Sequence, residues 1–105
     1  MSELLGVCTV DELPAGQRRT VEWEGTEIGV FNCDGEFLAI EDVCTHDGAS
    51  LGDGPLDTGA CTVECPRHGA LFDLRTGAAL TLPAYIPVET FPVLVEDGQI
   101  KIEVE

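Results

Sequence analysis

The chain contains two histidines, and each lies within three residues of a cysteine. Cys44 and His46 form a C-x-H pair, and Cys65 and His68 form a C-x-x-H pair further along the chain. Thiolate and imidazole groups together suit zinc, iron and copper, and both spacings allow two side chains of one loop to reach the same site. The pattern therefore predicts one metal centre in which all four side chains are ligands.

Two kinds of metal centre could use this set of ligands. Zinc modules usually show pairs of two cysteines or pairs of two histidines, whereas each pair here mixes one Cys with one His. A mixed pair in each loop suits an iron–sulfur cluster in which one iron takes both thiolates and the other takes both imidazoles. The pairing favours such a [2Fe-2S] cluster, with a structural zinc domain as the alternative.

The elements that position these residues are expected to be strands, because apolar residues recur with a period of two and turn dipeptides follow at short intervals. Strands are predicted near 5–10, 18–23, 26–33, 37–41, 60–64, 70–74, 86–96 and 100–104, with turns at Glu24-Gly25, Asp34-Gly35, Thr76-Gly77 and Asp97-Gly98. Residues 11–16 are expected to form one helical turn at most. This pattern predicts an all-β fold, a small antiparallel sandwich or barrel.

The four predicted ligands fall in two loops. Residues 42–59 contain four glycines and form a segment too long for an ordinary hairpin connection, which indicates a functional loop. Residues 65–69 form a tight loop between two short strands. At one end of a β scaffold, two such loops can face each other.

The motif block resembles the Rieske [2Fe-2S] family, and within it the small ferredoxins of bacterial ring-hydroxylating dioxygenases. The resemblance lies in CTH at 44–46, CPRHG at 65–69, LFDLRTG at 71–77 and LPA at 82–84. It implies a single Rieske-type domain over 1–105 with its cluster-binding loop subdomain at about 42–84, and one cluster per chain. It also implies that the two cysteines hold the inner iron, that the two histidines hold the outer iron, and that a third loop at 82–84 covers the cluster.

The resemblance further implies a one-electron carrier, not an enzyme, with a flavin reductase as donor and a terminal Rieske non-haem iron oxygenase as acceptor. Both histidines are committed to the cluster, so none is left for a mononuclear iron site that activates oxygen. The chain is expected to be a monomer. The alternative is a small Rieske-like subunit of a nitrite-reductase-type complex.

The resemblance also bears on the reduction potential. High-potential members of the family carry a loop disulfide and two hydroxyl groups that donate to the cluster, at positions that look like Ala49, Arg67, Ala70 and Phe72 here. Because these groups are missing, we expect a potential near the low end of the Rieske range, about −150 mV.

The charge of the chain excludes several partners. Five Lys and Arg stand against twenty Asp and Glu among 105 residues, a formal net charge of −15. Nucleic acids and anionic membranes bind through Lys and Arg, so neither is expected as a partner. The opening residues MSELLGVCTV show no secretory signal, and we expect the protein in the cytoplasm.

The three remaining cysteines are expected to be structural. An odd number of cysteines in a reducing compartment argues against a disulfide framework. Cys8, Cys33 and Cys61 fall in strand patterns, where a thiol behaves as a small buried apolar group. Trp23 and Tyr85 are likewise expected to be packing residues, and the alternative for Tyr85, which is next to the proline-bearing third loop, is a place near the cluster.

Overall fold

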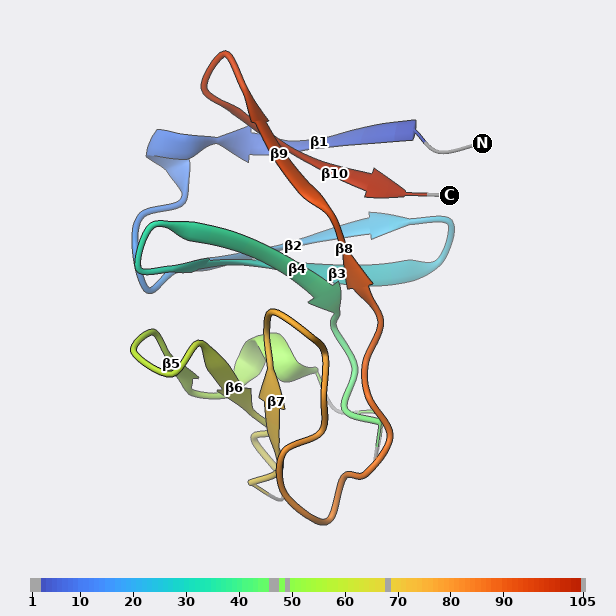
Figure 1. The fold of residues 1–105 in the computed structure, drawn as a ribbon. Coiled ribbons are helices and arrows are strands. Elements are labelled where there is room, and N and C mark those ends of the chain that lie inside the picture. The colour runs from blue at the N-terminus through green and yellow to red at the C-terminus, as the bar shows by residue number, and fades with distance from the viewer. Residues whose placement is uncertain (1–2, 46–47, 49, 68, 105) are drawn as a thin grey trace.

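The computed structural model describes residues 3–45, 48, 50–67 and 69–104, and in this part of the chain the regular elements are strands and two short 3-10 helices (Figure 1). The strands are β1 (Glu3–Thr9), β2 (Arg18–Trp23), β3 (Thr26–Cys33), β4 (Glu36–Glu41), β5 (Leu56–Asp57), β6 (Thr62–Glu64), β7 (Leu71–Asp73), β8 (Thr90–Phe91), β9 (Val93–Glu96) and β10 (Gln99–Val104). The helical turns are η1 (Val10–Glu12) and η2 (Leu51–Asp53). The predicted all-β fold is confirmed.

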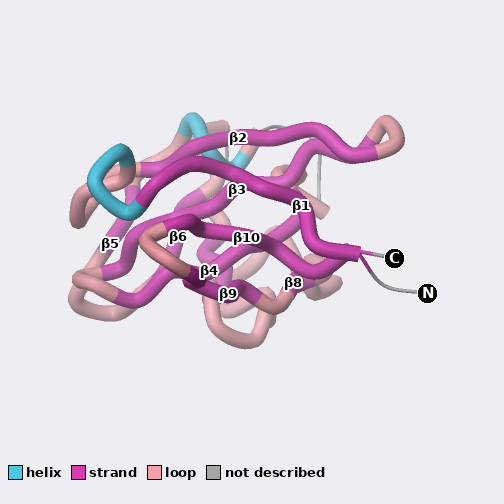
Figure 2. Tube along the Cα trace, turned by 90° about the horizontal axis from the view of Figure 1, so that it is seen from above, coloured by secondary structure: helices cyan, strands magenta, loops and turns pink. Residues whose placement is uncertain are grey.

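The strands form three antiparallel sheets, in the orders β1-β10-β9, β2-β3-β4-β8 and β5-β6-β7. The first two sheets lie one above the other, and the third lies at the end of the molecule away from both termini (Figure 1). The helical turns lie at the periphery in the view from above (Figure 2). No helix among the described residues has the length and hydropathy needed to cross a bilayer.

Strand β3 separates two apolar cores. Ile28 and Val30 pack with Ile100 and other side chains of the first sheet, whereas Phe31 packs against the part of the molecule that contains β5, β6 and β7. Successive strand residues point to opposite faces of a sheet. Because both faces of β3 are covered, its residues from Ile28 to Cys33 are buried without interruption.

Three hairpin turns share one conformation and one kind of sequence. Both residues have positive φ at Glu24-Gly25 (48° and 82°), Asp34-Gly35 (57° and 100°) and Asp97-Gly98 (51° and 75°). This is the geometry of a two-residue turn whose twist matches that of the strands it joins, and glycine at the second position tolerates it. The predicted turns at these three places are confirmed.

The region before the last hairpin differs from the prediction. In place of one strand over 86–96, the structure has the two-residue β8 and, after Pro92, the separate strand β9. Proline has no N–H group to donate to a neighbouring strand. Pro92 therefore interrupts the pairing, and β8 pairs with β4 while β9 pairs with β10.

Candidate metal centre

Cys44 and Cys65, two of the predicted ligands, are buried in the same apolar core. Cys44 follows the end of β4, and Cys65 begins the connection between β6 and β7. The backbone N–H of Cys65 donates to the carbonyl oxygen of Ala70 at 2.7 Å, which continues the hairpin to the loop. The second and third sheets thus place Cys44, after β4, and Cys65, after β6, in one core.

Both cysteines begin the same type of turn. The N–H of Gly48 donates to the carbonyl oxygen of Cys44 at 2.8 Å, and the N–H of Gly69 donates to that of Cys65 at 3.0 Å. Both glycines are in the left-handed region, with φ of 80° and 76°, where glycine is favoured. The repeated spacing C-x-x-x-G is the sequence signal for these matched turns, and the spacing of Cys and His alone does not reveal it.

Asp42 is a buried carboxylate that organises the first loop. It accepts hydrogen bonds from the Ser50 hydroxyl at 2.7 Å and from the Gly52 N–H at 2.6 Å, and its own N–H donates to the Glu27 carbonyl oxygen at 2.9 Å. A buried carboxylate is stable only when its oxygens are hydrogen-bonded. Asp42 therefore joins the two ends of the segment that carries Cys44, a role that sequence reasoning did not assign.

Residues 77–88, here called the proline loop, lie beside both cysteine turns. The loop is closed at its base by a hydrogen bond from the Val88 N–H to the Gly77 carbonyl oxygen at 2.8 Å. The Thr45 hydroxyl donates to the Ile86 carbonyl oxygen at 2.6 Å, and Ala84 is buried in the core that contains Cys44 and Cys65. Figure 1 shows the loop, in orange, at the end of the molecule away from the termini.

The described part of the site fits the sulfur half of the predicted ligand set, because two buried thiols reach one core from two matched turns. His46 and His68 lie outside the described residues, so their part in the site stays a prediction. Ala49 lies outside them as well. Of the other positions compared with high-potential proteins, Ala70 and Phe72 are buried and Arg67 is exposed.

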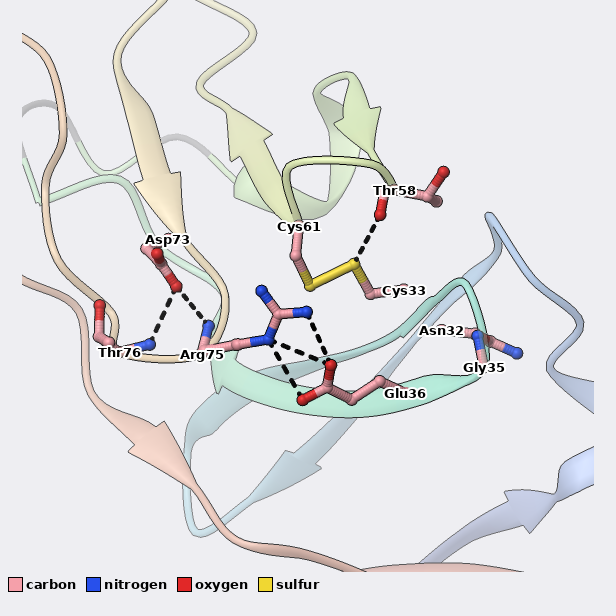
Figure 3. Close-up of polar contacts among 9 residues, drawn as sticks. All are labelled: Asn32, Cys33, Gly35, Glu36, Thr58, Cys61, Asp73, Arg75 and Thr76. Carbon is pink, nitrogen blue, oxygen red and sulfur yellow. Dashed lines mark hydrogen bonds and ion pairs between the residues drawn. A yellow bond between two sulfur atoms is a disulfide. The ribbon is translucent and has the colours of Figure 1, made fainter.

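Cys33 and Cys61 are buried as predicted, but the expectation that no disulfide forms was wrong for these two residues. The structure joins Cys33 of β3 and Cys61, which follows β5, in a disulfide 28 residues apart in sequence (Figure 3). The bond connects the second sheet to the β5-β6-β7 sheet, and sequence spacing gave no indication that these residues meet. Cys8 is buried as predicted, and burial raises the pKa of its thiol.

An ion pair lies close to this disulfide in Figure 3. The Arg75 guanidinium donates to both carboxylate oxygens of Glu36, with the shortest contact at 2.8 Å. This hydrogen-bonded carboxylate raises the pKa of Arg75. Glu36 belongs to β4 and Arg75 follows β7, so the pair is a second link between the same two sheets.

Trp23 and Tyr85 differ from each other in their surroundings. Trp23 packs partly against the core that contains Ile28 and Val30, and its ring N–H donates to the Glu3 carboxylate at 3.1 Å. Tyr85, by contrast, is exposed in the proline loop. Its predicted packing role is wrong, because the loop buries its neighbour Ala84 instead.

Comparisons with known proteins agree with this arrangement. Residues 3–92 match the family model described as the Rieske [2Fe-2S] domain. The chain is 54% identical over 104 residues to the 3-phenylpropionate/cinnamic acid dioxygenase ferredoxin subunit of Photorhabdus laumondii subsp. laumondii, covering 99% of this chain and 96% of that protein.

Two solved structures are similar to the fold. The ferredoxin of carbazole 1,9a-dioxygenase from Nocardioides aromaticivorans has a TM-score of 0.90 and 32% identity, covering 94% of this chain and 95% of that chain. A chain in a complex of reduced oxygenase and oxidised ferredoxin in carbazole 1,9a-dioxygenase has a TM-score of 0.89 and 35% identity, covering 94% and 91%.

Proposed function

This chain belongs to the Rieske [2Fe-2S] domain family, and we propose that it is a one-electron carrier, a ferredoxin that serves a terminal Rieske non-haem iron oxygenase. The observation that carries the proposal is its similarity, along almost the whole chain, to a dioxygenase ferredoxin subunit. A flavin reductase is the proposed donor. In this function the chain is an electron-transfer component and not itself an enzyme.

The proposed ligands of the one [2Fe-2S] cluster are Cys44, His46, Cys65 and His68. The matched turns hold the two cysteines in a buried core, where both bind as thiolates. The cluster, when bound, supplies a one-electron redox couple. With two thiolates and two neutral imidazoles its oxidised form has no net charge, whereas four thiolates would give −2, so this ligand set makes the added electron less costly.

The proposed ferredoxin is a cytoplasmic monomer that diffuses between its partners. A known complex of a similar ferredoxin with its oxygenase supports the acceptor half of this scheme. The resemblance to dioxygenase ferredoxin subunits also favours a separate carrier over the small subunit of a nitrite-reductase-type complex. Gel filtration of native extract tests this choice, because a stable heteromeric assembly would support the subunit.

The experiment that tests the function is electron delivery by the purified holoprotein. We expect iron and sulfide at two each per chain, an EPR signal of mixed nitrogen and sulfur ligation after reduction, and a midpoint potential of about −150 mV. The reduced protein should then reduce a terminal Rieske oxygenase. A colourless zinc protein would contradict the cluster, and a midpoint above about +100 mV would contradict the expected potential.

The ligand assignment has its own test in a matched pair of cysteine variants. Cys65→Ser should lose the visible absorption of the cluster, since a serine hydroxyl is a poor replacement for a thiolate ligand. Cys8→Ser changes a buried cysteine of the other core and should keep the cluster. Equal absorption per chain in both variants would exclude Cys65 as a ligand.

A further inference from the structure

A cavity of about 340 Å³ opens where the first sheet meets the second. It is lined by Trp23 of β2, Thr26 of β3, the segment 89–92 around β8, and Glu103 of β10. In Figure 1 the β2–β3 hairpin and the end of β10 lie on the same side of the molecule as the termini. The volume is in the range of small-molecule sites, about 300 to 1,000 Å³. None of these lining residues belongs to the cysteine turns or to the proline loop.

Two aromatic rings form the apolar part of the cavity wall. Trp23 and Phe91 both pack against the core that contains Ile28, and both stay partly exposed. The Trp23 ring N–H already donates to the Glu3 carboxylate at 3.1 Å, so the one hydrogen-bond donor of this ring is occupied. The ring therefore offers a ligand its π-electron surface, which attracts cations.

The polar part of the wall carries two carboxylates, those of Glu89 and Glu103. Among the described residues, neither carboxylate takes part in an ion pair or in a side-chain hydrogen bond. Their backbones are fixed, because the Glu103 N–H donates to the Pro92 carbonyl oxygen at 2.9 Å and the Glu89 carbonyl oxygen accepts from the N–H that follows β4 residue Ile40, also at 2.9 Å. Two uncompensated negative charges thus lie beside two aromatic rings.

Strand pairing holds the walls of the cavity in place. Trp23 and Thr26 are the last pair of the β2–β3 hairpin, and Phe91 pairs with Ala39 of β4. Because regular pairing positions both rings, the cavity is preformed, which reduces the entropy lost when a ligand binds.

We propose that this cavity binds a small quaternary ammonium cation, a role separate from electron transfer. Aromatic rings recognise such cations because they attract the charge and contact the methyl groups around it. A primary ammonium fits less well, since it is strongly hydrated and needs three hydrogen-bond acceptors. Two uncompensated carboxylates on a chain of net charge −15 exclude anions. They also favour the free cation over the same group in a phospholipid, because they repel the neighbouring phosphate.

Trp23 is the only tryptophan of the chain, so its fluorescence reports directly on the cavity. The test titrates the holoprotein with choline and with dimethylbutanol, the uncharged analogue in which carbon replaces the quaternary nitrogen. We expect a saturable change with choline and a Kd of about 1 mM at about 20 mM salt. The alcohol should bind at least about tenfold more weakly, because the rings and carboxylates attract the charge. Titration calorimetry gives an independent Kd for each compound.

Two variants with the same change of charge locate the site. Glu89→Gln/Glu103→Gln removes both carboxylates of the cavity and should weaken choline binding about fivefold. Glu96→Gln/Asp97→Asn removes two charges at the β9–β10 turn, away from the cavity (Figure 1), and should change the Kd less than about twofold. Asparagine tolerates the positive φ of position 97. Trp23→Leu, measured by calorimetry, should weaken binding about tenfold.

Four results would overturn the inference. Equal affinity for choline and dimethylbutanol would mean that the cavity is apolar and does not select a cation. Choline at about 50 mM, well above the expected Kd, could give neither a saturable fluorescence change nor heat. An equal loss of affinity in the two charge variants would make the net charge responsible and not the cavity. Cosedimentation of the protein with phosphatidylcholine vesicles would assign the site to a lipid headgroup and not to a free cation.

Discussion

Gly54 shows how one residue can fix the frame of the site. Its carbonyl oxygen accepts a hydrogen bond from the Arg18 guanidinium at 2.6 Å, and its N–H donates to the Leu51 carbonyl oxygen at 3.1 Å. A Cβ atom at this position would overlap the Glu64 carbonyl oxygen. Only glycine therefore lets the first loop lie against the strand that leads to Cys65.

Gly54→Ala should destabilise the protein by about 2 to 3 kcal/mol, because backbone atoms and not a flexible side chain must move to relieve the overlap. Urea unfolding of the holoprotein measures the change. Gly6→Ala is the matched control, since a Cβ there meets no atom within 4 Å, and its effect should stay within about 0.5 kcal/mol. Equal stabilities for the two variants would contradict the predicted overlap.

Glu12 makes the stability of the fold depend on pH. Its carboxylate accepts hydrogen bonds from the Thr9 N–H at 2.9 Å and from the Thr9 hydroxyl at 3.0 Å. The backbone hydrogen bond is the main cause that lowers the pKa of Glu12, with the hydroxyl second. A lowered pKa in the folded state means that the ionised carboxylate stabilises the fold.

The stabilisation by Glu12 should be fully present above the ordinary pKa of a glutamate and should disappear as the pH falls through the lowered pKa of the folded state. Glu12→Gln should therefore reduce the free energy of unfolding near pH 7 and match the unaltered protein near pH 2, where both side chains are neutral. Denaturant unfolding across this range measures the difference. A difference that persists unchanged at low pH would contradict the role of the charge.

At the scale of elements, the local features were predictable from the sequence and the remote contacts were not. The turn at Asp34-Gly35 follows from two adjacent residues, because few residue types tolerate positive φ. The predicted strand over 86–96 failed because its path depends on partners from β4 and β10, distant in sequence. The pairing of Cys33 with Cys61 was not predicted for the same reason, since it requires knowing that β3 lies beside the loop after β5.

The disulfide should stabilise the link between the second and third sheets by about 3 kcal/mol, because it closes a segment of 28 residues and restricts the unfolded chain. We expect denaturant unfolding of the unaltered protein to show a higher midpoint without reductant than with it. Cys33→Ala/Cys61→Ala should show the same midpoint in both conditions.

A count of thiols checks the bond directly. Of the five cysteines, two are in the disulfide, so the denatured protein without its cluster should react with three equivalents of a thiol reagent before reduction and five after it. In the folded protein Cys33 and Cys61 are both buried, and burial limits attack on their disulfide by an external thiolate. Five reactive thiols before reduction would show that the bond is absent.

At the scale of the whole molecule, the site depends on contacts that spacing alone does not reveal. The mixed Cys and His pairs predicted a metal centre, and the structure brings Cys44 and Cys65 into one core. The role of Asp42 could not be predicted, because it appears only when Ser50 and Gly52 fold back toward it. The exposure of Tyr85 was equally hidden, since it depends on which residue of the proline loop faces the core.

The high net charge of this small protein should make its stability depend on salt concentration. The radius of gyration is 12.8 Å. At about 0.01 M salt the screening length is about 30 Å, so every carboxylate is repelled by all the others. At about 0.1 M salt only carboxylates within about 10 Å of each other repel strongly. Lys101 and Arg75, in ion pairs with Glu96 and Glu36, offset little of the charge. Unfolding separates the carboxylates, so repulsion favours the unfolded chain.

Raising the salt from about 0.01 to about 0.1 M should therefore increase the melting temperature by about 5 °C, equivalent to about 1 kcal/mol for a domain of this size. Calorimetry of the holoprotein measures it, with sodium and potassium chloride compared to show that ionic strength and not one cation is responsible. The ion pair of Arg75 with Glu36 acts in the opposite direction, because salt weakens attraction as well as repulsion. A melting temperature that falls with salt would mean that such pairs outweigh the repulsion among the carboxylates.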